Sequence, residues 1–151
     1  MLNNNFDKSV FDLLVENGAN VNHPEYFSGD TPLVTAYSTV DHKAVDYLLE
    51  KGANSLQVDT HGNSLASIIQ RDINDQIHLE VANHYKQILV NKYNVKFPVN
   101  VSYRKGIMER IKRYEKTTPE EKAFLGSDEA KRIEEMRKSL ITGVYDGVRI
   151  D

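Results

Sequence analysis

The chain of 151 residues contains no cysteine and no long hydrophobic run. The absence of cysteine excludes disulfide bonds and thiol chemistry, and it is compatible with a reducing compartment. No apolar stretch reaches the length of about eighteen residues that a membrane helix needs. The first residues also lack the basic region and apolar segment of a secretory signal. We therefore expect a cytoplasmic protein with no membrane span, although non-classical delivery into another cell would leave no trace in the sequence.

Familiar catalytic motifs are also absent. The chain has no Gly-x-Gly-x-x-Gly, no phosphate loop ending in Gly-Lys-Ser/Thr, no His-Glu-x-x-His and no Gly-x-Ser-x-Gly. Glu80 and His84 are four residues apart and would share a helix face, but two ligands do not make a metal site. His61 lies in a repeat loop beside Gly62, which favours a loop hydrogen bond over catalysis, and no acid or nucleophile lies at a telling distance from His23, His42 or His78. We therefore expect no enzyme activity, no metal and no cofactor.

An internal repeat is the most informative feature that is present. The tripeptide Gly-Ala-Asn at 18–20 recurs at 52–54, and each copy follows an apolar run, at 11–15 and 45–49. A fixed period of this size indicates units that cannot bury their apolar face alone and must stack on a neighbour. We therefore expect function on a stacked surface, not in a deep pocket.

Residue types within the repeat predict where its helices begin and end. Thr31 is expected to cap a helix that starts at Pro32, with Leu33 opening its buried face. Gly18 and Gly52 lie just past the periodic apolar residues, where helices often end in a left-handed residue. Thr-Pro-Leu therefore starts a helix, and Gly-Ala-Asn ends one.

The middle unit, residues 28–54, resembles the ankyrin repeat. Gly-Asp-Thr-Pro-Leu at 29–33, Ala36 and the Leu-Leu pair at 48–49 lie in the order and spacing of that family. One departure is Val34, which stands where the family usually has a histidine that bonds between loops. The resemblance implies an all-α fold, a short ankyrin-repeat solenoid of about three repeats whose terminal repeats are incomplete.

Two domains are expected from this reading. Residues 1–95 would form the ankyrin-repeat stack, with an incomplete first repeat over 6–20 and a degenerate third repeat in which Ser64 takes the place of the capping threonine. Fewer than about three repeats seldom bury enough core to stand alone. Residues 96–151 are therefore expected to be a helical C-terminal extension that packs on the stack or caps it.

The extension is predicted to contain an extended segment followed by helices. Residues 95–101 alternate apolar with polar positions, which favours an extended segment. Apolar residues at helical spacing predict an amphipathic helix over 103–116 and a last helix over 127–143. A capping-box motif at Thr118 predicts a short helix between them that ends at Gly126. The expected apolar faces are Ile107, Met108, Ile111 and Tyr114, then Ala130, Ile133, Met136 and Leu140, while 144–151 either folds back or projects.

Charge is divided unevenly between the two regions. Residues 1–95 carry six Lys and Arg against twelve Asp and Glu, whereas 96–151 carry thirteen against ten. A basic patch could meet phosphates or an acidic protein surface. Its simpler interpretation is a solvated face, or complementarity with the acidic stack. The patch consists of Arg104, Lys105, Arg110, Lys112, Arg113 and Lys116.

The resemblance implies a protein–protein interaction module that binds through loop tips and exposed positions on the first helices. We expect an adaptor or inhibitor whose partner is another protein, and the sequence does not rank effector, immunity protein, viral antagonist or cellular regulator. The alternative is that the basic helix binds nucleic acid or an anionic surface while the repeats dock a partner. The partner-binding residues carried over by the resemblance are Tyr26, Phe27, Ser28, Asp30, Ser38, Thr39, Val58, Thr60, His61, Asn63, Arg71 and Asp72.

The first loop is the favoured contact because Tyr26 and Phe27 are adjacent aromatic residues. Exposing both is costly, and tyrosine is enriched among interface hot spots. The competing interpretation is that one of them folds back and covers the edge of the stack, since aromatic residues are usually buried.

Overall fold

The computed structural model describes residues 7–151 and is mostly helical, which confirms the all-α prediction at the level of fold class. None of the helices in this range is long and apolar enough to cross a membrane. The elements in chain order are α1 (Lys8–Glu16), α2 (Pro32–Ser38), α3 (His42–Glu50), α4 (Leu65–Asn74), α5 (Leu79–Tyr93), α6 (Tyr103–Glu115), α7 (Pro119–Thr142), β1 (Val144–Tyr145) and β2 (Val148–Arg149).

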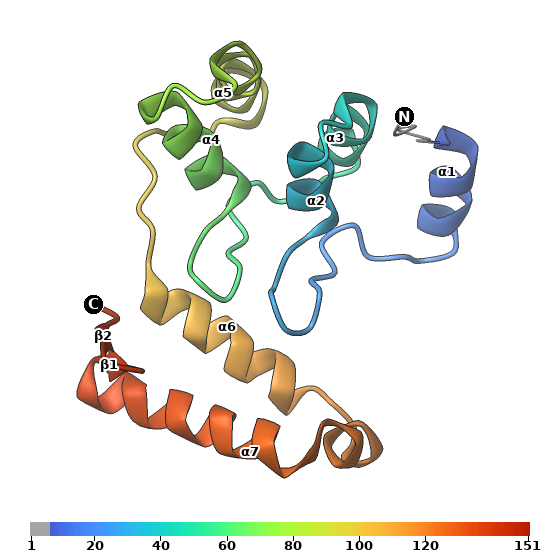
Figure 1. The fold of residues 1–151 in the computed structure, drawn as a ribbon. Coiled ribbons are helices and arrows are strands. Elements are labelled where there is room, and N and C mark those ends of the chain that lie inside the picture. Colours follow the sequence, from blue (N-terminus) through green and yellow to red (C-terminus); the bar gives the residue numbers. More distant parts are fainter. Residues whose placement is uncertain (1–6) are drawn as a thin grey trace.

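The first five helices lie side by side at one end of the molecule (Figure 1). Helix α2 packs on α3, α4 packs on α5, and α2 also contacts α4. Helix α1 joins them through an edge-on contact between Phe11 and Tyr47, whose hydroxyl donates to Asp12 at 2.7 Å. One apolar core runs through these helices, and its fully buried members include Leu33, Leu65 and Tyr85.

The predicted helix boundaries are confirmed at several residues. The Thr31 hydroxyl accepts from the backbone N–H of Val34, and Pro32 occupies the first helical position. The Ser64 hydroxyl caps α4 in the same way. Gly18 and Gly52 both have φ of 89°, the left-handed conformation expected where a helix ends.

Two long loops, before α2 and before α4, extend away from the helices and lie against each other (Figure 1). The Thr60 backbone N–H donates to the carbonyl of Ser28 at 2.9 Å, and its hydroxyl donates to the carbonyl of Phe27 at 2.9 Å. Nearer the helices, the Asn22 side chain accepts from the backbone N–H of Asn54 at 2.7 Å. Thr60 and Asn22 thus tie the two loops together. Val34, which stands where the ankyrin family usually has the bonding histidine, lies in α2.

The segment between α5 and α6 is extended, as predicted, and it packs along α4. Phe97 and Val99 lie against the core of the first five helices. The Gln70 side chain holds this segment by both of its polar atoms, donating to the Val99 carbonyl at 2.9 Å and accepting from its N–H at 2.7 Å. This contact brings the chain to the level of the loop tips, where α6 begins.

Helices α6 and α7 pack together below the loops and form a second, smaller core (Figure 1). Its buried residues are Ile107, Ile111, Ile133, Met136 and Ile150. The chain is non-helical at Gly126, with φ of 85°, so α7 has the interruption that the sequence predicts there. The terminal segment folds back as the β1–β2 hairpin, which buries Ile150.

Two details of the predicted helix faces are wrong. Met108 was expected on the buried side of α6 but is 42% exposed. Ala130 was expected on the buried side of α7, yet it is exposed and its neighbour Glu129 is buried. The reason is that α7 turns a carboxylate toward α6, where Arg110 pairs with it. Position 6, at the start of the expected first repeat, lies outside the described residues.

Candidate functional site

The expected partner-binding residues fall into two main places in the structure, and the first is the junction of the loop tips with α6. Tyr26, Phe27, Thr60 and His61 all lie here. The His61 ring meets the Tyr103 ring edge-on, with centroids 5.9 Å apart. A Cβ atom added to Gly106 would overlap the carbonyl oxygen of Thr60, so α6 approaches the second loop more closely than a residue with a side chain would allow.

Arg113 clamps both loops to α6. Its Nε donates to the carbonyl of Tyr26 at 2.8 Å, and its Nη2 donates to the hydroxyl of Thr60 at 2.7 Å. Burial and the neighbouring charge of Arg110 lower the pKa of Arg113, although an arginine remains protonated at any physiological pH. The Arg113 side chain therefore joins two loops that are separated in the sequence by helices α2 and α3.

A buried charged group lies beside this clamp. Arg110 pairs with Glu129, and both side chains are almost fully buried. The Tyr26 hydroxyl donates to Glu129 at 2.7 Å, and the Arg110 guanidinium lies over the Tyr26 ring at 4.7 Å from its centroid. Burial, and then the bond to Glu129, raises the pKa of Tyr26 to about 12. Burial alone would raise the pKa of Glu129, but the bonds from Arg110 and Tyr26 outweigh it and lower that pKa.

The three arginines of the predicted basic patch all have partners within the molecule. Those of Arg110 and Arg113 are given above. Arg104 pairs with Asp151 at 2.6 Å and donates to the carbonyl of Leu140 at 2.8 Å. Of the three lysines, Lys112 lies 3.4 Å from Glu109, and Lys105 and Lys116 are exposed. The positive surface that α6 offers to solvent consists mainly of these lysines.

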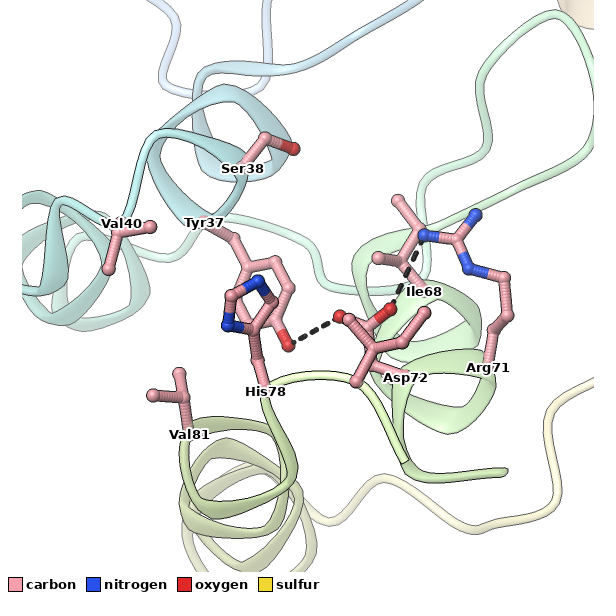
Figure 2. A pocket seen from close by; sticks show the side chains of 9 residues that line it. Tyr37, Ser38, Val40, Ile68, Arg71, Asp72, His78 and Val81 are labelled. Atoms are coloured by element: carbon pink, nitrogen blue, oxygen red, sulfur yellow. Dashed lines mark hydrogen bonds and ion pairs between the residues drawn. The ribbon is translucent and has the colours of Figure 1, made fainter. Parts of the chain in front are cut away.

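The second place is a pocket between α2, α4 and α5, where Ser38, Arg71 and Asp72 come together (Figure 2). Its volume is about 300 Å³. The Tyr37 hydroxyl donates to Asp72 Oδ2 at 3.0 Å, while Arg71 Nη2 approaches Asp72 Oδ1 at 3.4 Å. Burial, and then the bond to Asp72, raises the pKa of Tyr37, so its phenol stays protonated and remains a donor.

A scan against family models and searches of curated proteins and solved structures all found no match.

The apolar wall of the pocket was not anticipated from the sequence. Val40 and His78 have positive φ, of 60° and 45°, which places them at the turns that close α2 and open α5. Both residues line the pocket, which these two turns help to form (Figure 2). A positive φ is rare for valine, so the sequence does not predict this turn at Val40. The lining residues that sequence reasoning missed are Tyr37, Val40, Ile68, Ile77, His78 and Val81.

The other expected contact residues are dispersed. Asp30 and Thr39 line a more open hollow that also includes Phe11 of α1. Val58 is only 7% exposed, at the base of the second loop. The Asn63 carbonyl accepts from the backbone N–H of Asp59, and the Asn63 N–H donates to the Asp59 carboxylate, so this residue shapes that loop. Ser28 is not dispersed but belongs with the loop tips, where its carbonyl accepts from the backbone N–H of Thr60.

No group of three His, Asp or Glu side chains within residues 7–151 is placed to hold a metal ion. Glu80 and His84 are both exposed on α5. The pocket offers other chemistry: an apolar wall, a guanidinium at its rim and a carboxylate held by a phenol. Such a site can enclose a side chain and hydrogen-bond to the backbone that carries it.

Proposed function

We propose that this chain is an ankyrin-type protein-binding module, acting as an adaptor or inhibitor, that holds a segment of a partner protein in the pocket of Figure 2. The supporting observation is that Ser38, Arg71 and Asp72, three residues carried over from the ankyrin resemblance, line one pocket with an apolar wall. The two helix pairs with long loops before α2 and α4 also fit that resemblance. Binding, not catalysis, suits the lining.

The pocket chemistry favours an apolar side chain next to a hydrogen-bond acceptor. Ile68 and Val81 supply surface against which an apolar group can be buried. The Arg71 side chain is 59% exposed, and at 3.4 Å its bond to Asp72 is longer than an ordinary hydrogen bond. Arg71 therefore keeps donors for a carbonyl or carboxylate of the partner. The Asp72 carboxylate is already held by Tyr37.

Selection from a display library of short random peptides on the full-length protein tests this function. The enriched peptides should bind the wild type and lose at least about tenfold in affinity, or 1.4 kcal/mol, on the Arg71→Glu variant. Ser38→Trp should weaken binding similarly by filling the mouth of the pocket. Lys43→Glu, the same charge reversal on an exposed residue of α3, is the matched control. If no enriched peptide binds Arg71→Glu or Ser38→Trp more weakly than Lys43→Glu, the proposal is refuted.

The alternative, in which helix 103–116 binds nucleic acid, has weaker support. Three of its six cationic residues, Arg104, Arg110 and Arg113, are bound within the molecule. Binding through the remaining lysines would fall steeply with salt, because phosphate contacts release counterions. A salt titration with double-stranded DNA and RNA as probes distinguishes the two functions.

A further inference from the structure

Phe124 is the most conspicuous exposed side chain of the described molecule. It lies in the first segment of α7 and is 91% exposed. Beside it lies Phe27 of the first loop, which is 53% exposed. Together they flank a hollow of about 380 Å³ between the loop and α7, called here the aromatic hollow. It is lined by Tyr26, Phe27, Thr117, Glu120, Glu121, Phe124 and Leu125.

The Phe27 side of the aromatic hollow is held in place. The Tyr26 ring meets the Phe27 ring edge-on, with centroids 4.9 Å apart, and the Arg110 guanidinium lies 5.4 Å from the Phe27 centroid. Tyr26 and Arg110 are themselves fixed by Glu129. Preorganised aromatic surface loses little entropy on binding, which is why such residues contribute strongly to interfaces.

Two phenylalanine side chains exposed in one hollow are unfavourable in free energy unless another molecule covers them. Burial of apolar surface is worth about 25 cal/mol per Å², and an aromatic side chain offers well over about 100 Å². Scattered exposed apolar residues need no explanation, but apolar residues gathered at a hollow mark interaction sites. The aromatic hollow is of the second kind because its apolar residues come from two distant segments, the first loop and α7.

The charges of the aromatic hollow indicate what covers it. Among the residues that the structure describes, the charged ones that line it are Glu120 and Glu121, with no Lys or Arg. Glu121 accepts from the backbone N–H of Thr118, and this bond, with the Thr118 hydroxyl, lowers the pKa of Glu121, so it is ionised at neutral pH. The nearby Lys122 ammonium is engaged by the Thr117 carbonyl at 2.8 Å and by the Tyr114 ring. Carboxylates repel nucleic acid and anionic lipid, and they attract lysine and arginine.

We propose that the aromatic hollow docks a segment of a partner protein in which an apolar side chain is flanked by lysine or arginine. The apolar side chain packs between Phe27 and Phe124, and the flanking cations lie near Glu120 and Glu121. This surface is separate from the pocket of Figure 2, because the two share no lining residue. Helices α2, α4 and α5 lie at one end of the loops, and α7 lies at the other (Figure 1). It therefore goes beyond the function proposed above.

An array of short synthetic peptides tests this proposal against the full-length protein. Each peptide carries Leu, Phe, Ile or Ser at its centre, flanked either by Lys or by Glu. Lys-flanked peptides with an apolar centre should bind most tightly, as measured by fluorescence anisotropy. Phe124→Ala should weaken that binding at least about tenfold, and Glu120→Lys should weaken the Lys-flanked peptides selectively. Because Phe124 is almost fully exposed, its replacement should leave the melting temperature unchanged.

Two control variants make the result specific. Ile141→Ala removes another apolar side chain that is 88% exposed but lies elsewhere on α7, and it should leave binding unchanged. Arg71→Glu, in the pocket of Figure 2, should also leave it unchanged, which separates the two surfaces. The proposal is overturned if Glu-flanked or Ser-centred peptides bind as tightly, or if Phe124→Ala and Ile141→Ala have equal effects. Self-association abolished by Phe124→Ala, or Phe124-dependent binding to phosphatidylserine vesicles, would overturn it in favour of a second copy or a membrane.

Discussion

At the scale of single residues, Glu129 joins the first loop to the C-terminal helices through a buried charged group. It accepts from the Tyr26 hydroxyl, pairs with Arg110 and lies 3.3 Å from Arg132. Arg110 in turn supports the rings of Tyr26 and Phe27. Removing the carboxylate would leave a buried guanidinium without its counter-ion.

Replacing Glu129 by Gln should therefore destabilise the protein by about 3–5 kcal/mol, the usual cost of breaking one half of a buried ion pair. Urea unfolding at pH 7 measures this loss. Glu134→Gln is the matched control, since Glu134 is exposed and its pair with Arg137 at 3.3 Å is a surface pair worth less than about 1 kcal/mol. Equal losses in the two variants would contradict the importance assigned to Glu129.

The pH dependence of stability gives a second test of the same residue. The pKa of Glu129 is lowered on folding, so between the folded and unfolded pKa values the unfolded chain binds more protons. Its contribution is complete above the unfolded pKa, near 4.5, and is lost as pH falls through the lower folded pKa. The stability difference between wild type and Glu129→Gln should therefore shrink on acidification below about pH 4.5. A difference that stays constant down to pH 3 would be inconsistent with this assignment.

At the scale of elements, α6 docks on the second loop by close approach of backbone to backbone. Gly106 faces the carbonyl of Thr60, and Gly62 faces the backbone of Ser102 at the start of α6. Neither site has room for a Cβ atom. The contact thus depends on two glycines, one in the helix and one in the loop.

The Gly106→Ala variant separates local helix propensity from docking. Alanine stabilises an exposed helix interior by about 1 kcal/mol relative to glycine. Here it should instead weaken the protein, because its methyl group meets the Thr60 carbonyl. Hydrogen exchange in 103–115 should speed up, while the α2–α3 pair stays protected. Gly18→Ala is the control. It also removes a glycine, but its Cβ meets nothing within 4 Å, so it adds backbone strain without a steric clash. Slower exchange in Gly106→Ala would show that α6 does not dock this way.

What the sequence could predict at this scale was local, and what it missed was tertiary. Thr31 and Ser64 mark helix starts through bonds to their own neighbours, and Gly126 interrupts α7 through its own backbone conformation, so their residue types were enough. Glu129 reads as an exposed helix residue because its partners, Tyr26 and Arg110, are distant in the chain. The pocket of Figure 2 was missed in part for the same reason, since its wall joins the turns after α2 and before α5. The ankyrin resemblance predicts Ser38, Arg71 and Asp72 as contact residues, but it does not predict the apolar residues that complete the pocket.

At the scale of the whole molecule, two cores are joined mainly at the loop tips. The first core spans α2–α5 and the second lies between α6 and α7. The extended segment held by Gln70 joins them covalently, and Arg113 joins them through both loops. The pocket of Figure 2 is lined by the helices of the first core and the turns beside them, whereas the aromatic hollow lies between the first loop and α7, because it combines Phe27 with Phe124.

Arg113→Ala should therefore uncouple the two cores. The variant loses one bond to each loop, and hydrogen bonds to a charged group are worth about 1.5–3 kcal/mol each. Residues 103–142 should then exchange their amide hydrogens at lower urea concentration than residues 32–93, whereas the wild type should open both regions together.

Lys112→Ala is the control, because Lys112 is next to Arg113 on α6 and its ammonium lies 3.4 Å from the Glu109 carboxylate, and this variant should keep the single transition. If both regions of Arg113→Ala still open together, the cores are coupled by the Gln70 segment and not by the loop tips. If the regions separate, peptide binding to the aromatic hollow should weaken while binding to the pocket of Figure 2 persists, because only the hollow combines residues of the first loop with residues of α7.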